Sequence, residues 1–93
     1  MPSYVSLFKY TGAIEGGGPE RFAKAQQIAA EENCEITGVY GLLGAYDILA
    51  IVDCPDNRTA MKFAAKIGNL IGAKTQTMPA IERDDLLQLL AEL

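Results

Sequence analysis

Two short segments carry the side chains best suited to chemistry: Lys9 and Tyr10 at the end of one predicted strand, and Tyr46 and Asp47 at the start of another. Antiparallel neighbours place the end of one strand beside the start of the next, so we expect these segments to meet. Aromatic walls, one amine and one carboxylate favour a pocket for a small molecule. The candidate ligand-binding residues are therefore Tyr46, Asp47, Tyr10, Lys9, Phe8 and Tyr40.

Asp47 has two interpretations. Beside a tight turn, its carboxylate suits a structural role in which it accepts hydrogen bonds from backbone N–H groups of the loop. In a pocket it would instead be a carboxylate with a raised pKa, able to move a proton. Successive strand residues point to opposite faces, so at most one of Tyr46 and Asp47 faces a cavity between subunits. The sequence leaves open which one.

The loop from 12 to 18 contains the run Gly16-Gly17-Gly18 and is expected to lie above these residues. Three glycines make its backbone flexible, so the loop is interpreted as a cover for the pocket or as a simple linker. The N–H groups at a helix start are able to hold an anion. This loop lacks the Lys-Ser or Lys-Thr pair of a phosphate-binding loop, which argues against that use.

The chain has no histidine and two cysteines, Cys34 and Cys54. The missing histidine argues against general acid–base enzymes and against haem. Two cysteines do not close a zinc shell, and neither has a histidine to activate it as a nucleophile. We therefore expect no metal, no cofactor and no assignable catalytic residue. A two-residue turn at Gly44-Ala45 would place the two thiols on opposite sheet faces, whereas a register shifted by one residue would make them face each other.

Length and composition indicate one small domain covering residues 1–93. Hydrophobic residues make up 49% of the chain, which is enough for a packed core. The net charge of -4 argues against nucleic acid as a partner, because a phosphate backbone needs a basic surface. No apolar stretch approaches the roughly 20 residues of a membrane span, and the N-terminal segment lacks the pattern of a signal peptide. We therefore expect a cytoplasmic protein with no membrane partner.

Hydrophobic periodicity and turn residues predict alternating strands and helices. Strands are expected at 4–11, 35–43, 46–53 and 74–78, and helices at 19–33, between caps at Asp56 and Gly72, and at 82–93. The order βαββαβ with an added C-terminal helix predicts an α+β, ferredoxin-like fold. Such a fold has a four-stranded antiparallel sheet with both crossover helices on one face.

The run ILAIVD at 48–53 is apolar on both faces of its predicted strand. A strand with one wet face would alternate with polar residues instead. The chain is too short to cover both sheet faces with its own helices, so we expect a second copy to cover the open one. This predicts a homodimer or a higher homo-oligomer built as a dimeric α/β barrel. The leucine-rich final helix would pack either on the partner subunit or on its own chain.

Three stretches, YVSLFKY at 4–10, GAYD at 44–47 leading into ILAIVDCPD, and TQTMPAI at 75–81, resemble the GYD domain family. These are small proteins of the dimeric α/β barrel superfamily, and the likeness covers nearly the whole chain. The glycine-rich loop from 12 to 18 departs from the family pattern. The resemblance implies the ferredoxin-like fold. It implies no reaction, since the family has no well-defined activity.

Three functions stay open. The first is a self-associating module that binds a small ligand or acts in regulation, with no assignable reaction. The second is a cofactor-independent enzyme, oxygenase-like or isomerase-like, whose pocket lies between the sheet and the loop 12–18. The third is a structural subunit of an assembly. The composition favours the first over an enzyme, because proton transfer usually recruits histidine.

Overall fold

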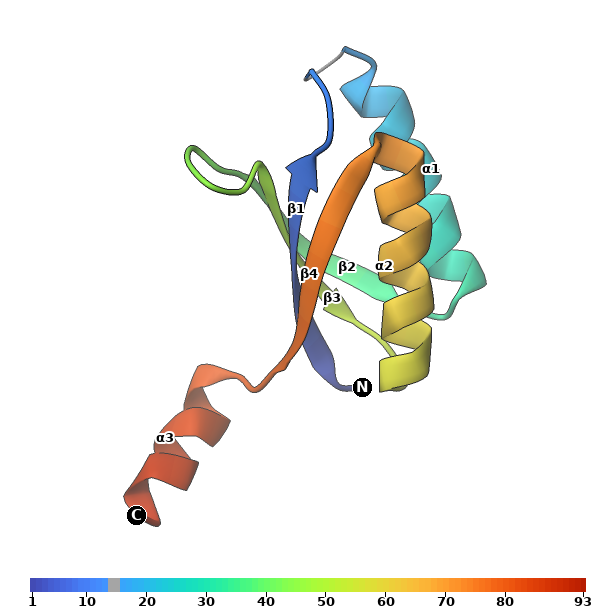
Figure 1. The fold of residues 1–93 in the computed structure, drawn as a ribbon. Helices are drawn as coiled ribbons and strands as arrows, with labels where there is room; N and C mark the ends of the chain where they lie inside the picture. Colours follow the sequence, from blue (N-terminus) through green and yellow to red (C-terminus); the bar gives the residue numbers. More distant parts are fainter. Residues whose placement is uncertain (14–15) are drawn as a thin grey trace.

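The computed structural model describes residues 1–13 and 16–93 (Figure 1). Within them the elements follow the predicted order, βαββαβ with a final helix. They are β1 (Ser3–Tyr10), α1 (Gly18–Glu31), β2 (Glu35–Gly41), β3 (Ile48–Asp53), α2 (Asn57–Ile71), β4 (Ala73–Ala80) and α3 (Arg83–Ala91). β4 extends beyond the predicted 74–78 at both ends, and β3 starts later than the predicted 46.

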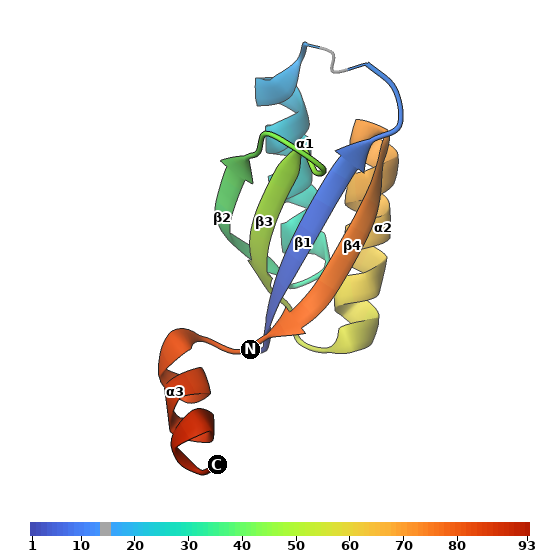
Figure 2. The same ribbon diagram turned by 60° about the vertical axis from the view of Figure 1, so that its left-hand side comes forward.

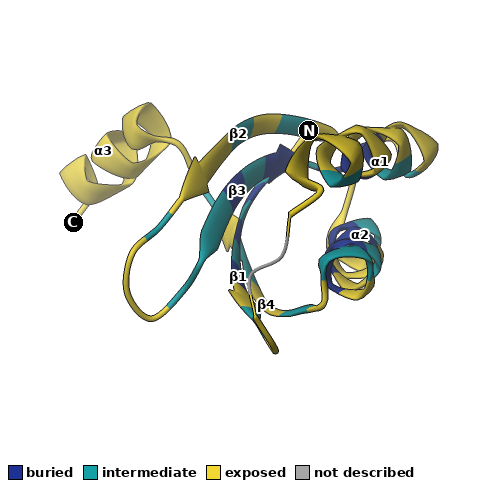
Figure 3. Cartoon of the chain, turned by 90° about the horizontal axis from the view of Figure 1, so that it is seen from above, coloured by how far each residue is buried: buried dark blue, intermediate teal, exposed yellow. Residues whose placement is uncertain are grey.

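The strands form one antiparallel sheet in the order β2-β3-β1-β4 (Figure 2). α1 and α2 lie on the same face of this sheet (Figure 3). The predicted ferredoxin-like α+β fold is therefore confirmed. The end of β1 lies beside the start of β3, as expected, because Phe8 pairs with Ile48.

Alternation along β1 and β3 sorts their side chains between the two faces of the sheet. On the helix-covered face Tyr4, Phe8 and Val52 are almost fully buried. Apolar side chains on the other face keep part of their surface exposed, because α1 and α2 do not reach them. We call this second surface the open face. Its apolar residues are Val5, Leu7, Tyr40, Leu49, Ile51 and Met78.

α2 lies between its two predicted caps. The Asp56 carboxylate accepts a hydrogen bond from the N–H of Thr59 at 2.7 Å, which satisfies a backbone donor of the first turn. Gly72 ends the helix with a φ of 69°, a left-handed conformation that glycine adopts at low cost. Between these caps, Phe63 and Ile67 lie on the side of the helix that is buried against the sheet.

The register between β2 and β3 shifts by one residue at Thr37, where a β-bulge inserts an extra residue into β2. The Thr37 hydroxyl donates to a backbone carbonyl of β3 at 3.2 Å, which holds the bulge in place. Beyond the bulge Glu35 pairs with Asp53, so Cys34 and Cys54 are the next residues on the two strands. The expectation that the thiols point to opposite faces is wrong: both are buried in the same helix-covered core.

The connection between β2 and β3 is also longer than predicted. A loop over 42–47 replaces the expected two-residue turn at Gly44-Ala45. The N–H of Leu42 donates to the carbonyl of Asp47 at 2.9 Å and closes this loop. Gly44 has a φ of 122°, which explains why glycine occupies its tip.

α3 extends away from the sheet beyond the end of β4 (Figures 1 and 2). Within residues 1–13 and 16–93 it contacts no other helix or strand. Its exposed leucines are Leu86, Leu87, Leu89 and Leu90. Of the two predicted alternatives, packing on its own chain is therefore wrong. None of the helices in the described part of the chain is long and apolar enough to cross a membrane.

Candidate functional site

Asp47 ties the end of β1 to the loop that leads into β3. Its carboxylate oxygen Oδ2 accepts a hydrogen bond from the N–H of Tyr10 at 2.8 Å. Its own N–H donates to the carbonyl of Phe8 at 2.8 Å. The carbonyl of Asp47 accepts the N–H of Leu42 across the loop. This geometry is that of a structural clamp, although the carboxylate holds the end of a strand rather than the loop itself.

Tyr46, Lys9 and Tyr40 lie with the open face. The Tyr46 hydroxyl donates a hydrogen bond to the side-chain carbonyl of Gln76 on β4. Because β1 lies between β3 and β4, the Tyr46 side chain reaches across β1 to make this contact. Lys9 is exposed, and 58% of the surface of Tyr40 is exposed. These three side chains lie on a surface and do not line a shared cavity.

Phe8 and Tyr10 lie on the helix-covered face, where they line a cavity of about 240 Å³ between α1, α2 and the sheet. We call it the apolar cavity. Its other lining residues include Phe22, Ala25, Ile36, Val39, Ala50 and Phe63. The structure thus separates the predicted ligand-binding residues: two line the apolar cavity, three lie on the open face, and Asp47 holds the end of β1.

Sequence reasoning did not find most of this cavity. Ala25 on α1 and Ala50 on β3 both line it, and both are too small to fill the space between helix and sheet. Phe22 and Val39 stand at its edge, where 43% and 46% of their surfaces are exposed. The available sequence signal for the cavity was the presence of two small residues at core positions that face each other. In the sequence they were indistinguishable from ordinary members of apolar stripes.

A second depression of about 370 Å³ adjoins the apolar cavity, beneath the chain that follows β1. Thr11 and the end of α2 line it, and we call it the polar hollow. Tyr10, Arg21 and Ile71 line both spaces. Of the six predicted ligand-binding residues, Tyr10 lines this hollow and the other five do not, and residues 14 and 15 of the loop 12–18 lie outside the described residues.

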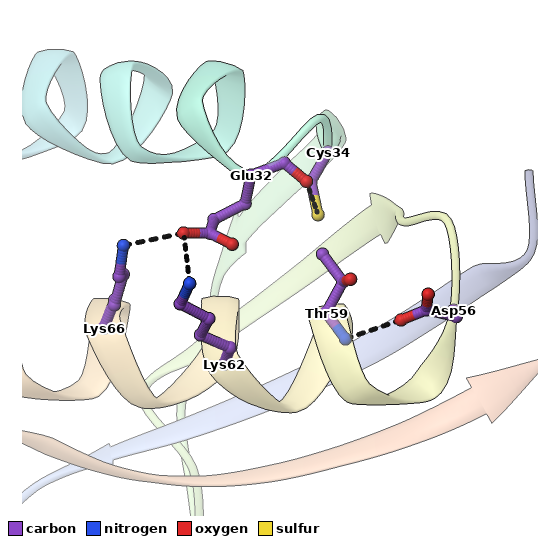
Figure 4. Close-up of polar contacts among 6 residues, drawn as sticks. All are labelled: Glu32, Cys34, Asp56, Thr59, Lys62 and Lys66. Carbon is purple, nitrogen blue, oxygen red and sulfur yellow. Dashed lines mark hydrogen bonds and ion pairs between the residues drawn. The ribbon is translucent and has the colours of Figure 1, made fainter.

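An ion-pair cluster joins the end of α1 to α2 (Figure 4). Glu32 Oε2 lies 2.7 Å from Nζ of Lys66 and 3.4 Å from Nζ of Lys62. The hydrogen bond between Glu32 and Lys66 lowers the pKa of Glu32 and raises the pKa of Lys66. This cluster holds together the two helices that, with the sheet, enclose the apolar cavity.

These spaces offer more to a bound molecule than to a reaction. The apolar cavity presents aromatic and aliphatic side chains, whereas the polar hollow adds a polar edge that includes Thr11, whose hydroxyl donates to the carbonyl of Gly72 at 2.9 Å and keeps its lone pairs as acceptors. The carboxylate of Asp47 is engaged by the N–H of Tyr10, and the Tyr46 hydroxyl by Gln76. A concave, largely apolar site with a polar edge suits a small amphipathic molecule.

The fold and the site define the class of this protein: a ferredoxin-like α+β domain with one helix-covered sheet face and one open face. The chain belongs to the GYD domain family, whose model matches residues 4–90. The resemblance seen in the sequence is therefore confirmed. No protein with a curated description matches the chain in sequence.

Solved structures with the same fold include two that are regulatory proteins by name. The leucine response regulatory protein LrpA of Mycobacterium tuberculosis matches with a TM-score of 0.63 at 11% identity, over 87% of this chain and 51% of LrpA. An AsnC family transcriptional regulator from Agrobacterium tumefaciens gives 0.56 at 19% identity, over 88% and 52%. TTHA0845 from Thermus thermophilus gives 0.56 at 23% identity, over 88% and 95%. The chain thus spans about half the length of the two regulators, and the likeness is one of fold.

Proposed function

We propose that this protein is a self-associating, cytoplasmic regulatory module that binds a small amphipathic molecule. One observation carries the proposal: the apolar cavity and the polar hollow adjoin and share Tyr10, Arg21 and Ile71. A ligand with a hydrocarbon body and a polar end would place each part in a matching environment. The ligand binds reversibly, and no covalent bond is formed or broken.

The volume of the apolar cavity limits the ligand. An apolar cavity of about 150 Å³ in another protein admits benzene. A space of about 240 Å³ therefore has room for a bicyclic ring or a short aliphatic chain. The lining of Phe8, Phe22 and Phe63 favours a flat ring, because aromatic side chains pack well against one another.

Two further observations support regulation and self-association. LrpA and the AsnC family protein are regulators by name, and they share the fold of this chain. The open face carries apolar side chains from each strand of the sheet, which a second open face would cover. The net charge of -4 supports a role without direct contact to nucleic acid.

The proposal does not extend to catalysis. An oxygenase-like or isomerase-like reaction would need a proton carrier facing the cavity. The carboxylate of Asp47 and the hydroxyl of Tyr46 are engaged by Tyr10 and Gln76, which leaves Tyr10 as the one predicted site residue with an ionisable group in the lining of the cavity.

Binding is testable by NMR titration of isotope-labelled protein with indole and with indole-3-acetate. Indole is expected to shift the amide signals of Ala25, Val39 and Ala50, which line the apolar cavity. Indole-3-acetate, which adds a carboxylate, is expected to shift Thr11 as well, because Thr11 lines the polar hollow. Shifts confined to the open face would contradict the proposed site.

A variant that fills the cavity provides the control. Ala25→Leu is expected to raise the Kd for indole about tenfold or more, because the added side chain occupies the ligand's place. Ala23→Leu adds the same group at an exposed position of the same helix and should leave the Kd unchanged. Equal binding by the two variants would overturn the proposal.

A further inference from the structure

The two cysteines occupy facing positions at one end of the β2–β3 pair. The last paired residues there are Glu35 and Asp53. Cys34 and Cys54 are the residues just outside the two strands at this end. The β-bulge at Thr37 creates this arrangement, because without it the register would set the two cysteines one residue apart.

The two thiols lie close to each other, because a hydrogen bond between their side chains contributes to the pKa of both. The N–H of Cys34 donates to the carbonyl of Ala29 at 2.8 Å, and the N–H of Cys54 donates to the carbonyl of Pro2 at 3.0 Å. Both N–H groups therefore point away from the other cysteine, as they do at a non-hydrogen-bonded position of an antiparallel ladder. Facing Cα atoms at such positions lie about 4.5 Å apart. Disulfides form when the Cα atoms are about 4.4–6.8 Å apart.

Both side chains lie in the same core. Only 8% of the surface of Cys34 and 1% of that of Cys54 are exposed. Burial raises the pKa of both thiols, that of Cys54 to about 12, and each thiol also influences the pKa of the other. Both thiols are therefore protonated at neutral pH, so the oxidation proposed below is expected to be slow and to need an excess of peroxide. Cys34 is the more exposed, and its thiol donates to the carbonyl of Glu32 at 3.7 Å.

We propose that Cys34 and Cys54 are a redox-modification site, which hydrogen peroxide converts into an intramolecular disulfide within the folded domain. The Cys34 sulfur attacks one peroxide oxygen, the O–O bond breaks, and a sulfenic acid forms with release of water. The Cys54 sulfur then attacks the Cys34 sulfur and displaces a second water. Two S–H bonds are lost and one S–S bond forms, while peroxide takes up the two electrons.

The proposed disulfide would join two loops, one that follows helix α1 and one that precedes helix α2. Cys34 follows α1, next to Glu32, which Lys62 and Lys66 hold against α2 (Figure 4). Cys54 precedes Asp56, the N-cap of α2. The disulfide would therefore link the α1–β2 connection to the β3–α2 connection. This inference does not depend on the proposed ligand.

The test uses the wild-type protein and hydrogen peroxide. After oxidation, the protein is unfolded in the presence of an alkylating reagent without any reductant. The expected product has lost two hydrogen atoms, carries no alkyl group, and yields a cross-linked peptide containing Cys34 and Cys54. Dithiothreitol should restore both thiols. Two alkylated cysteines, or disulfides only between chains, would overturn the proposal.

A trapping experiment tests the order of the steps. Dimedone reacts with sulfenic acids, so it should label Cys34 in the Cys54→Ala variant and not in the wild type, where Cys54 consumes the intermediate. Equal labelling of the two proteins would also overturn the proposal. Circular dichroism checks that the variant is folded, and the wild-type measurement stands without it.

Discussion

The carboxylate of Asp47 accepts a hydrogen bond from the backbone N–H of Tyr10 at 2.8 Å. The N–H of Asp47 donates back to the carbonyl of Phe8, also at 2.8 Å. Together these bonds fix the end of β1 against the β2–β3 loop. They also fix Tyr10, which lines both the apolar cavity and the polar hollow. The aspartate of the GAYD stretch therefore acts on the site through the position of its neighbour.

Removing this carboxylate should destabilise the fold. Asp47→Ala leaves the N–H of Tyr10 without its charged acceptor, which typically costs about 1–3 kcal/mol. The midpoint of urea unfolding measures the loss. Asp47→Asn keeps an acceptor oxygen at the same place and should lose less. An unfolding midpoint for Asp47→Ala equal to that of the wild type would contradict the clamp.

At Gly68, α2 packs tightly against Ala73, the first residue of β4. A Cβ atom at this position would lie 2.8 Å from the carbonyl oxygen of Ala73, a backbone atom with little freedom to move. Gly68→Ala is therefore expected to lower the free energy of unfolding by about 1–3 kcal/mol, as overpacking does. Gly41→Ala is the matched control, because a Cβ atom at position 41 would have no neighbour within 4 Å. Equal stabilities of the two variants would count against this packing.

The fold was predictable because independent local signals agreed. Strand-favouring residues indicated the strands, and the N-cap at Asp56 and the C-cap at Gly72 indicated the two ends of α2. The structure has both caps. The order of the elements then restricted the topology to very few choices. The apolar character of both faces of β3 was likewise readable from residues 48–53 alone.

The β2–β3 register was not predicted, because it depends on a single inserted residue. The signal was Gly38, since a glycine inside a strand often marks a bulge. Its space is tight: a Cβ there would lie 3.4 Å from the ring of Tyr40. Missing the bulge at Thr37 led to the wrong relation between Cys34 and Cys54.

The candidate site was predicted only in part. Alternation separates Phe8 and Tyr10 from Lys9, but it does not say which face the helices cover. The apolar cavity depends on how far α1 stands from the sheet, given the small side chains of Ala25 and Ala50. That distance follows from tertiary packing, and no local pattern encodes it.

Stability should depend on pH through Glu32. Its pKa is lowered in the folded state, first by the hydrogen bond with Lys66 and then by Lys62. A lowered carboxyl pKa contributes stability above the ordinary value near 4.5, and this is lost as the pH falls through the folded-state value. The wild type should therefore exceed Glu32→Gln in urea midpoint at pH 7, and the difference should vanish at strongly acidic pH.

The salt dependence provides a second check on this cluster. Both lysines are partly exposed, so added salt should reduce the difference between the wild type and Glu32→Gln at pH 7. Glu92→Gln is the control, because Glu92 is exposed and lies near the C-terminus. It should leave the urea midpoint at pH 7 unchanged, both with and without added salt. A difference that persists unchanged at acidic pH would show that Glu32 acts through packing instead of charge.

Self-association should depend on the open face. Sedimentation of the wild type is expected to show a dimer at micromolar concentration. Ile51→Lys places a charge in the middle of that face and should raise the dissociation constant about 30-fold or more, the effect of losing ~2 kcal/mol. Met61→Lys introduces the same charge on the exposed side of α2 and should leave the dimer intact. A wild type that stays monomeric would refute the proposed self-association.

Removal of α3 separates its role in the fold from its role in assembly. Within residues 1–13 and 16–93 α3 contacts no other element, so a chain ending at Ile81 should keep its free energy of unfolding within about 0.5 kcal/mol under conditions where both proteins are monomeric. The exposed leucines of α3 are expected to pack against another surface. In the proposed dimer the two open faces already cover each other, so we expect the leucines to pack elsewhere on the partner subunit. Truncation should therefore weaken the dimer in sedimentation. The full-length double variant Leu86→Gln and Leu90→Gln should weaken it equally, because it removes the apolar stripe and keeps the helix. A truncated chain that dimerises as tightly as the wild type would show that α3 is not part of the interface.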